Sequence, residues 1–158
     1  MFEVKSVDKV TGNNSLLAQA SALLSGQKDL VANAANLSSL LFYALEDVNW
    51  VGFYFLKSNE LLVGPFQGRP ACVSIPLGKG VCGKAAATLS VQRVADVHAF
   101  DGHIACDAAS RSEIVLPLIK DGALIGVLDL DSPVRNRFDS EDERLLVSVA
   151  ELFVASLD

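Results

Sequence analysis

The sequence has no run of about 18 uninterrupted apolar residues, the length that a membrane-spanning helix needs. Residues 1–5 show no basic segment followed by an apolar one, so we see no export signal and no sign of a membrane partner. Repeats, linkers and low-complexity stretches are also missing from the 158 residues, a length typical of one domain. We therefore expect a single cytoplasmic domain over 1–158, with the polar residues 1–14 as a loose lead-in.

Basic residues are scarce and scattered. Thirteen Lys and Arg against nineteen Asp and Glu give a formal charge of −6. Binding to nucleic acid needs clustered basic side chains, so we expect no nucleic-acid partner. Hydrophobic residues make up 51% of the chain and charged residues 20%, a composition that can bury a core and that excludes a disordered protein.

Cysteine is limited to Cys72, Cys82 and Cys106. An odd number without an export signal does not indicate a structural disulfide framework. Their spacing, Cys-x9-Cys-x23-Cys, lacks the paired CxxC of a zinc knuckle. These cysteines with His103 would supply four zinc ligands, but the irregular separations argue against zinc and we expect no metal. Each cysteine could instead be a buried, small apolar residue.

Apolar periodicity predicts a helix near 16–24 and another over 30–46. The aromatic and β-branched segment 50–56 predicts a strand, with 61–66 as its hairpin partner. The elements predicted after it are a short strand at 72–75, a helix at 80–88, a short strand at 91–94, a loop at 95–111, a hairpin of 113–119 with 124–130, and a closing helix.

Two paired hairpins flanked by helices predict an α+β fold with a central antiparallel sheet. We expect helices on one face and a loop-covered pocket on the other. Loop 95–111 holds both His98 and His103, and loops of this length are often functional. Ser140 and Glu143 have the spacing of a capping box at the start of the closing helix.

Two cysteines have surroundings that favour reactivity over burial. Cys106 lies in a polar, turn-forming segment near His103, where a thiol can be held partly as thiolate. Cys82 follows a glycine-rich segment at the start of a predicted helix, where the helix dipole also favours thiolate. That segment, 78–83, matches no phosphate-binding motif, and its glycines are better explained by a tight turn.

Acidic side chains stand out in the second hairpin. Asp129 and Asp131 are two apart on a predicted strand and so share one face. They are either a solvated strand end or a receptor for a cation such as an ammonium group. Glu113, where the loop enters the hairpin, is either an exposed edge charge or a proton donor with a raised pKa.

Trp50 and Tyr54 share one side of their predicted strand, with Gly52 between them. Core packing explains most aromatic residues on strands. The alternative is a slot for an apolar group, since rings also make favourable contacts with sulfur.

Five sequence blocks together resemble the free methionine-(R)-sulfoxide reductases, a family of small GAF-domain enzymes. In chain order they are GPFQGRPAC (64–72), GKGVCG (78–83), GHIACD (102–107), SEIV (112–115) and GVLDLDS (126–132). The resemblance implies a single GAF-like domain that reduces free L-methionine (R)-S-oxide, with thioredoxin as reductant and no cofactor. The family also tends towards dimers.

The resemblance implies roles for all the cysteines. Cys106 would attack the sulfoxide and Cys72 would resolve the resulting sulfenic acid, while Cys82 is a third thiol that could itself be the attacker. The substrate pocket carries over to Trp50, Tyr54, Glu113, Asp129 and Asp131.

The reduction of a free sulfoxide would use each of these residues. Glu113 could protonate the departing oxygen, and a second thiol could condense with the sulfenic acid to form a disulfide. Asp129 and Asp131 could pair with the α-ammonium of a free amino acid. The competing interpretations are a GAF-type small-molecule sensor without turnover and a zinc-stabilised interaction module.

Overall fold

The computed structural model describes residues 2–4, 12–104, 106 and 109–158. Residues 1 and 5–11 of the predicted lead-in, and positions 105, 107 and 108 of the predicted loop, lie outside the described residues. The elements in chain order are α1 (Gly12–Leu24), α2 (Leu30–Ala44), β1 (Trp50–Lys57), β2 (Glu60–Gly68), β3 (Ser74–Pro76), α3 (Gly80–Thr88), β4 (Gln92–Val94), the 3-10 helix η1 (Val97–Ala99), β5 (Ser112–Lys120), β6 (Ala123–Ser132) and α4 (Ser140–Ser156).

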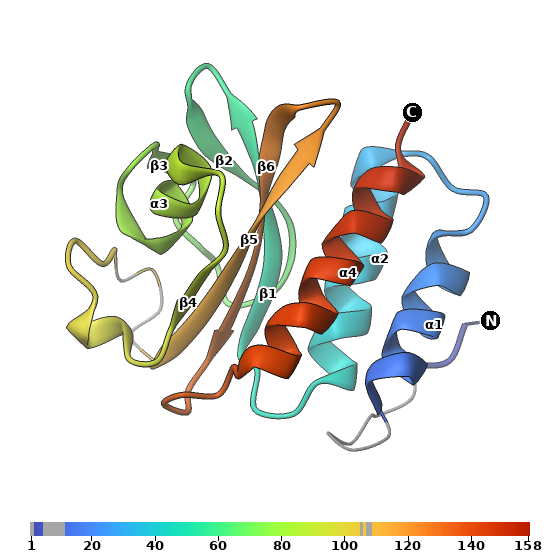
Figure 1. Ribbon diagram of the computed structural model, residues 1–158, viewed down its shortest axis with the longest axis horizontal. Coiled ribbons are helices and arrows are strands. Elements are labelled where there is room, and N and C mark those ends of the chain that lie inside the picture. The colour runs from blue at the N-terminus through green and yellow to red at the C-terminus, as the bar shows by residue number, and fades with distance from the viewer. Residues whose placement is uncertain (1, 5–11, 105, 107–108) are drawn as a thin grey trace.

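In the described part of the chain the strands form one six-stranded sheet in the order β3-β2-β1-β6-β5-β4. All neighbouring strands pair antiparallel. Figure 1 shows α1, α2 and α4 on one side of this sheet and α3 on the other. The predicted α+β class and both predicted hairpins are confirmed. The expected arrangement, with helices on one face and a loop-covered pocket on the other, is also confirmed, and α3 packs against β5 and β6 on the pocket side.

The two faces of the central strands build two different environments. On β1, Val51 and Phe53 belong to the core under the helices, where the Phe53 and Phe153 rings lie 4.6 Å apart. Trp50 and Tyr54 belong to a second buried cluster on the α3 side. Because side chains alternate across a strand, one segment contributes to the core and to the site at once.

The closing helix begins one residue away from the predicted capping box. The N-cap is Asp139 and not Ser140, and its partner is Asp142 and not Glu143. The Asp139 carboxylate accepts from the Asp142 backbone N–H at 2.9 Å, and Asp142 Oδ2 accepts from the Asp139 N–H at 2.9 Å. Arg137 also donates to Asp142 Oδ2 at 3.2 Å. A carboxylate held by this arginine makes the better reciprocal cap.

Other element boundaries differ in small ways. Helix α1 begins at Gly12, inside the predicted lead-in, and β3 begins at Ser74, so that Cys72 precedes the strand. The predicted loop 95–111 contains η1, whose first residue Val97 donates its N–H to the Arg111 carbonyl at 2.7 Å. None of the helices in the described part of the chain is both long and apolar enough to cross a bilayer.

Candidate active site

A single cavity on the α3 side of the sheet brings together most of the predicted site residues. Strands β1, β5 and β6, helix α3 and the loop before β5 all contribute to its wall. The predicted residues that line it are Trp50, Tyr54, Cys82, Cys106, Glu113, Asp129 and Asp131. Of the described residues predicted for the site, Cys72 alone is not part of the lining. Residues far apart in the sequence therefore share one enclosed wall.

The acidic part of the cavity is built by the second hairpin. Glu113 of β5 lies opposite Asp131 of β6, and Asp129 is two residues further along the same face. Glu113 is 7% exposed and Asp129 is 5% exposed. The alternative of a solvated strand end is wrong for Asp129, as is that of an exposed edge charge for Glu113.

Burial decides the protonation of this group. Desolvation raises the pKa of Glu113 well above its usual range, and the charges and hydrogen bonds of Asp129 and Asp131 raise it further. Burial also raises the pKa of Asp129, although hydrogen bonds from Glu113 and Cys82 oppose that shift. The raised pKa favours the protonated form of Glu113, which donates a hydrogen bond to its acidic neighbours.

One carboxylate oxygen of these acids lacks a hydrogen-bond donor. Asp129 Oδ1 is buried and has no hydrogen-bond partner among the described residues. A buried acceptor without a donor is unfavourable, so such an atom points to a missing donor. The acidic residues that line the cavity suit a cationic donor for this oxygen.

Cys82 differs from its prediction. The side chain is buried, and burial raises the pKa of the Cys82 thiol well above its usual range, with Asp129 and Glu113 adding to the shift. The expectation that the helix start favours a thiolate here was wrong, because desolvation and nearby acids outweigh the helix dipole. The thiol instead hydrogen-bonds to Asp129.

Three residues of the cavity wall could bind a metal ion. Donor atoms of Cys82, Glu113 and Asp129 all lie within 4.8 Å of one another, so these residues could share a cation. The zinc site considered from the sequence, with the three cysteines and His103 as ligands, is not formed, because Cys72 and Cys106 are bonded to each other. Within the described cluster, Glu113 and Cys82 also hydrogen-bond to Asp129.

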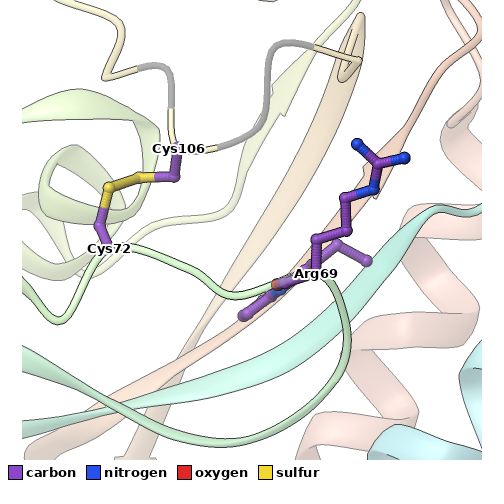
Figure 2. The surroundings of a disulfide bond; sticks show 4 residues. Arg69, Cys72 and Cys106 are labelled. Carbon is purple, nitrogen blue, oxygen red and sulfur yellow. A yellow bond between two sulfur atoms is a disulfide. The ribbon is translucent and has the colours of Figure 1, made fainter.

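The disulfide joins Cys72, just after β2, to Cys106 in the loop before β5 (Figure 2). Their Cα atoms are 5.5 Å apart, and the bridge spans 34 residues of sequence. The disulfide thereby ties Cys106, which lines the acidic cavity, to Cys72, which does not. Figure 2 also shows the Arg69 side chain pointing away from the bridge.

Aromatic rings form another wall. Trp50 stacks on Tyr54, with centroids 5.8 Å apart, and on Phe66, with centroids 5.2 Å apart. The Trp50 indole N–H donates to the Arg69 carbonyl at 3.1 Å, which fixes the ring. The prediction that Trp50 and Tyr54 share a side is confirmed. Gly52 makes room for the rings, because a Cβ there would overlap Trp50 and Phe66.

The glycine-rich segment makes the predicted tight turn. Gly78 and Gly80 have φ of +83° and +64°, and the Gly78 N–H donates to the Gly83 carbonyl at 2.8 Å. Two polar residues that sequence reasoning did not select, Lys79 and Ser110, also line the cavity. Neither has a sequence pattern that separates it from an ordinary loop residue.

His103 also lines the cavity, near the loop that carries Cys106. Partial burial lowers the pKa of His103, and the nearby His98 lowers it further. A neutral imidazole is therefore favoured, which gives little electrostatic help to a thiolate.

Comparisons with known proteins agree with this geometry. Residues 31–158 match the model of the GAF domain. A free methionine-R-sulfoxide reductase of Escherichia coli is 56% identical over 140 residues, which cover 87% of this chain and 85% of the relative. The chain belongs to the GAF-domain family of free methionine-R-sulfoxide reductases.

Solved structures of the family superpose closely. The free methionine-R-sulfoxide reductase of Neisseria meningitidis in complex with its substrate is 41% identical, with a TM-score of 0.93 over 99% of this chain and 94% of the other. A Burkholderia vietnamiensis protein, provisionally described as a GAF sensor, is 57% identical, with a TM-score of 0.89 over 92% of each chain. The resemblance found in the sequence blocks is thus confirmed.

Proposed function

We propose that this protein reduces free L-methionine (R)-S-oxide to L-methionine, with Cys106 as the attacking thiol. The observation that carries the proposal is the cavity that has Cys106 and the acids Glu113, Asp129 and Asp131 in one wall. Family membership supports the same reaction, because relatives at high identity are free methionine-R-sulfoxide reductases. The (R) configuration follows from those relatives.

The first step transfers oxygen from the substrate to the enzyme. The Cys106 thiolate attacks the sulfoxide sulfur, and the oxygen takes up one proton. This attack forms a bond between the Cys106 sulfur and the substrate sulfur. That S–S bond and the S–O bond of the substrate then break as the oxygen passes to the Cys106 sulfur, where a new S–O bond forms. Methionine sulfur gains two electrons and Cys106 loses two, which leaves a sulfenic acid on Cys106.

Glu113 supplies the proton in this proposal. Its carboxyl group is buried, and the raised pKa favours its protonated form. A neutral acid in the cavity wall can donate a hydrogen bond to the sulfoxide oxygen and then transfer its proton.

The acids also explain a preference for the free amino acid. Asp129 has a buried oxygen without a partner, which an α-ammonium group could satisfy. Asp131 lies on the same strand face and adds negative charge. A methionine sulfoxide residue within a protein has an amide in place of this ammonium, so it lacks the charge that the acids would bind. Trp50 and Tyr54 would contact the S-methyl end.

The second step forms the Cys72–Cys106 disulfide. The Cys72 thiol displaces hydroxide from the sulfenic acid, and with the thiol proton this oxygen leaves as water. Both cysteines are half-buried, so a protein dithiol can approach them. We propose thioredoxin as that reductant, which becomes oxidised to its disulfide and returns Cys72 and Cys106 to thiols.

Mass spectrometry of the reduced protein tests the proposal. One equivalent of free methionine (R)-S-oxide should yield methionine and a protein lighter by about two daltons, the mass of two hydrogens. Peptide mapping should locate the bond between Cys72 and Cys106. Intact thiols with bound ligand would refute the reductase and favour a sensor.

Single variants separate the roles of the thiols. Cys106→Ser should lose turnover completely, whereas Cys72→Ser should release one equivalent of methionine and stop at the sulfenic acid. Full activity of Cys106→Ser would move the attack to Cys82. Thioredoxin is tested by coupled turnover with its reductase, against dithiothreitol as a chemical control.

A further inference from the structure

A free amino acid brings a carboxylate as well as an ammonium group. Both groups sit on the same carbon atom, so a site that holds the ammonium with acids also holds the carboxylate close to those acids. Asp129 and Asp131 carry charge of the same sign as that carboxylate, so the carboxylate needs a hydrogen-bond donor close to them. The cavity therefore needs a donor next to its acidic wall.

Ser110 has the properties of this donor. Its side chain lines the cavity and is 5% exposed. Its hydroxyl oxygen accepts a hydrogen bond from Asn49 Nδ2 at 3.5 Å. Within the described residues the Ser110 hydroxyl donates to no acceptor, so its hydrogen is available to a ligand. A hydrogen bond from a neutral donor to a charged group is among the stronger ones.

The backbone places Ser110 at the acidic end of the sheet. The Arg111 N–H donates to the Ser132 carbonyl at 2.7 Å, and the Asn49 N–H donates to the Asp131 carbonyl at 3.0 Å. Ser110 and Asn49 thus flank the end of β6 that carries Asp131. The Asn49 Oδ1 atom is buried and has no partner among the described residues, so this polar pair is not fully satisfied within the protein.

We propose that Ser110 donates its hydroxyl hydrogen to the α-carboxylate of the substrate and that Asn49 is a positioning residue that orients this hydroxyl. The inference rests on the proposed function and names a specificity element within it. Lys79 is the competing donor, since it also lines the cavity. Its side chain is exposed, and a solvated ammonium at the mouth binds less selectively than a buried hydroxyl.

A pair of substrates tests the assignment on the full-length protein. One is free L-methionine (R)-S-oxide and the other is (R)-3-(methylsulfinyl)propylamine, which keeps the ammonium and the sulfoxide but lacks the carboxylate. Ser110→Ala should lower kcat/KM for the amino acid about 10- to 100-fold, as expected for losing a hydrogen bond to a charged group. For the amine the same variant should match the wild type.

Asn49→Asp separates positioning from packing. The introduced carboxylate is close in shape to the amide, but it accepts the Ser110 hydrogen and so withdraws it from the substrate. We expect the same selective loss for the amino acid, with activity on the amine retained. Ser90→Ala, an exposed serine after α3, is the control and should leave both substrates unaffected.

Three results would overturn the assignment. They are a wild-type kcat/KM of Ser110→Ala for the amino acid, an equal loss of kcat/KM for both substrates in Ser110→Ala, or a loss confined to the amino acid in Lys79→Met and not in Ser110→Ala. Calorimetric binding of L-methionine and of 3-(methylthio)propylamine repeats the comparison without turnover. A protein that reduces nothing yet binds methionine through Ser110 refutes the proposed function alone. Normal turnover of the free sulfoxide by both wild type and Ser110→Ala refutes only this inference.

Discussion

Glu113→Gln should change how the stability of the protein depends on pH. In the folded protein, burial, together with Asp129 and Asp131, raises the pKa of Glu113 well above its usual range. In the unfolded chain the carboxyl group returns to a pKa of about 4.3. Between these two values the folded state binds the proton and the unfolded state does not. The free energy of unfolding therefore falls as pH rises through this window.

The size of the effect follows from proton linkage. One group that is protonated only in the folded state lowers the free energy of unfolding by about 1.4 kcal/mol for each pH unit. The contribution is complete below pH of about 4.3 and is lost once the pH passes the folded pKa of Glu113. Glutamine keeps a donor for Asp129 but has no proton to release. The variant should lose this slope and become more stable than the wild type as pH rises.

Urea unfolding at pH 5, 6, 7 and 8 measures the slope, with the disulfide kept oxidised in both proteins. Trp50 is the only tryptophan and is 3% exposed, so its fluorescence reports unfolding of the site itself. Glu60→Gln removes an exposed acid from the β1–β2 hairpin and should follow the wild type. Parallel pH profiles for wild type and Glu113→Gln would show that Glu113 ionises normally, and the proposed proton donor would be lost with it.

Three further predictions concern binding and packing. Asp129→Asn should raise KM for the free sulfoxide at least tenfold through the lost ammonium contact, and steady-state kinetics that give an unchanged KM would remove Asp129 from substrate binding. Gly52→Ala should destabilise the protein by about 1–3 kcal/mol, since its methyl group would overlap Trp50 and Phe66; a wild-type urea midpoint would contradict this. Asp139→Ala should cost about 1 kcal/mol by removing the cap of α4, and thermal unfolding without a shift would argue against the cap.

Local patterns predicted most of the elements correctly. Helix α3 has the predicted bounds, and the strands of both hairpins extend the predicted ones by one or two residues at their ends. The alternation of side chains on β6 correctly placed Asp129 on the face away from the core. Such features depend on neighbours in sequence, through strand and helix periodicity.

The protonation states could not be predicted in the same way. The position of Cys82 at a helix start predicted a thiolate, but burial raises the pKa of its thiol, and Asp129 and Glu113, which are more than thirty residues away in the sequence, raise it further. Which acid caps α4 likewise depended on Arg137, whose side chain selects Asp142. Desolvation and contacts between distant segments have no signature in a short window.

The sequence by itself determined which segments form strands and helices along the chain, and which sequence blocks carry the candidate site residues. Both follow from periodicity and residue type, which are local properties. Only the tertiary structure decided that Cys72 and Cys106 meet, that Glu113 is buried beside two other acids, and that Ser110 faces the same cavity. The physical reason is that a side chain's electric field, solvation and hydrogen-bond partners come from whatever the folded chain packs around it.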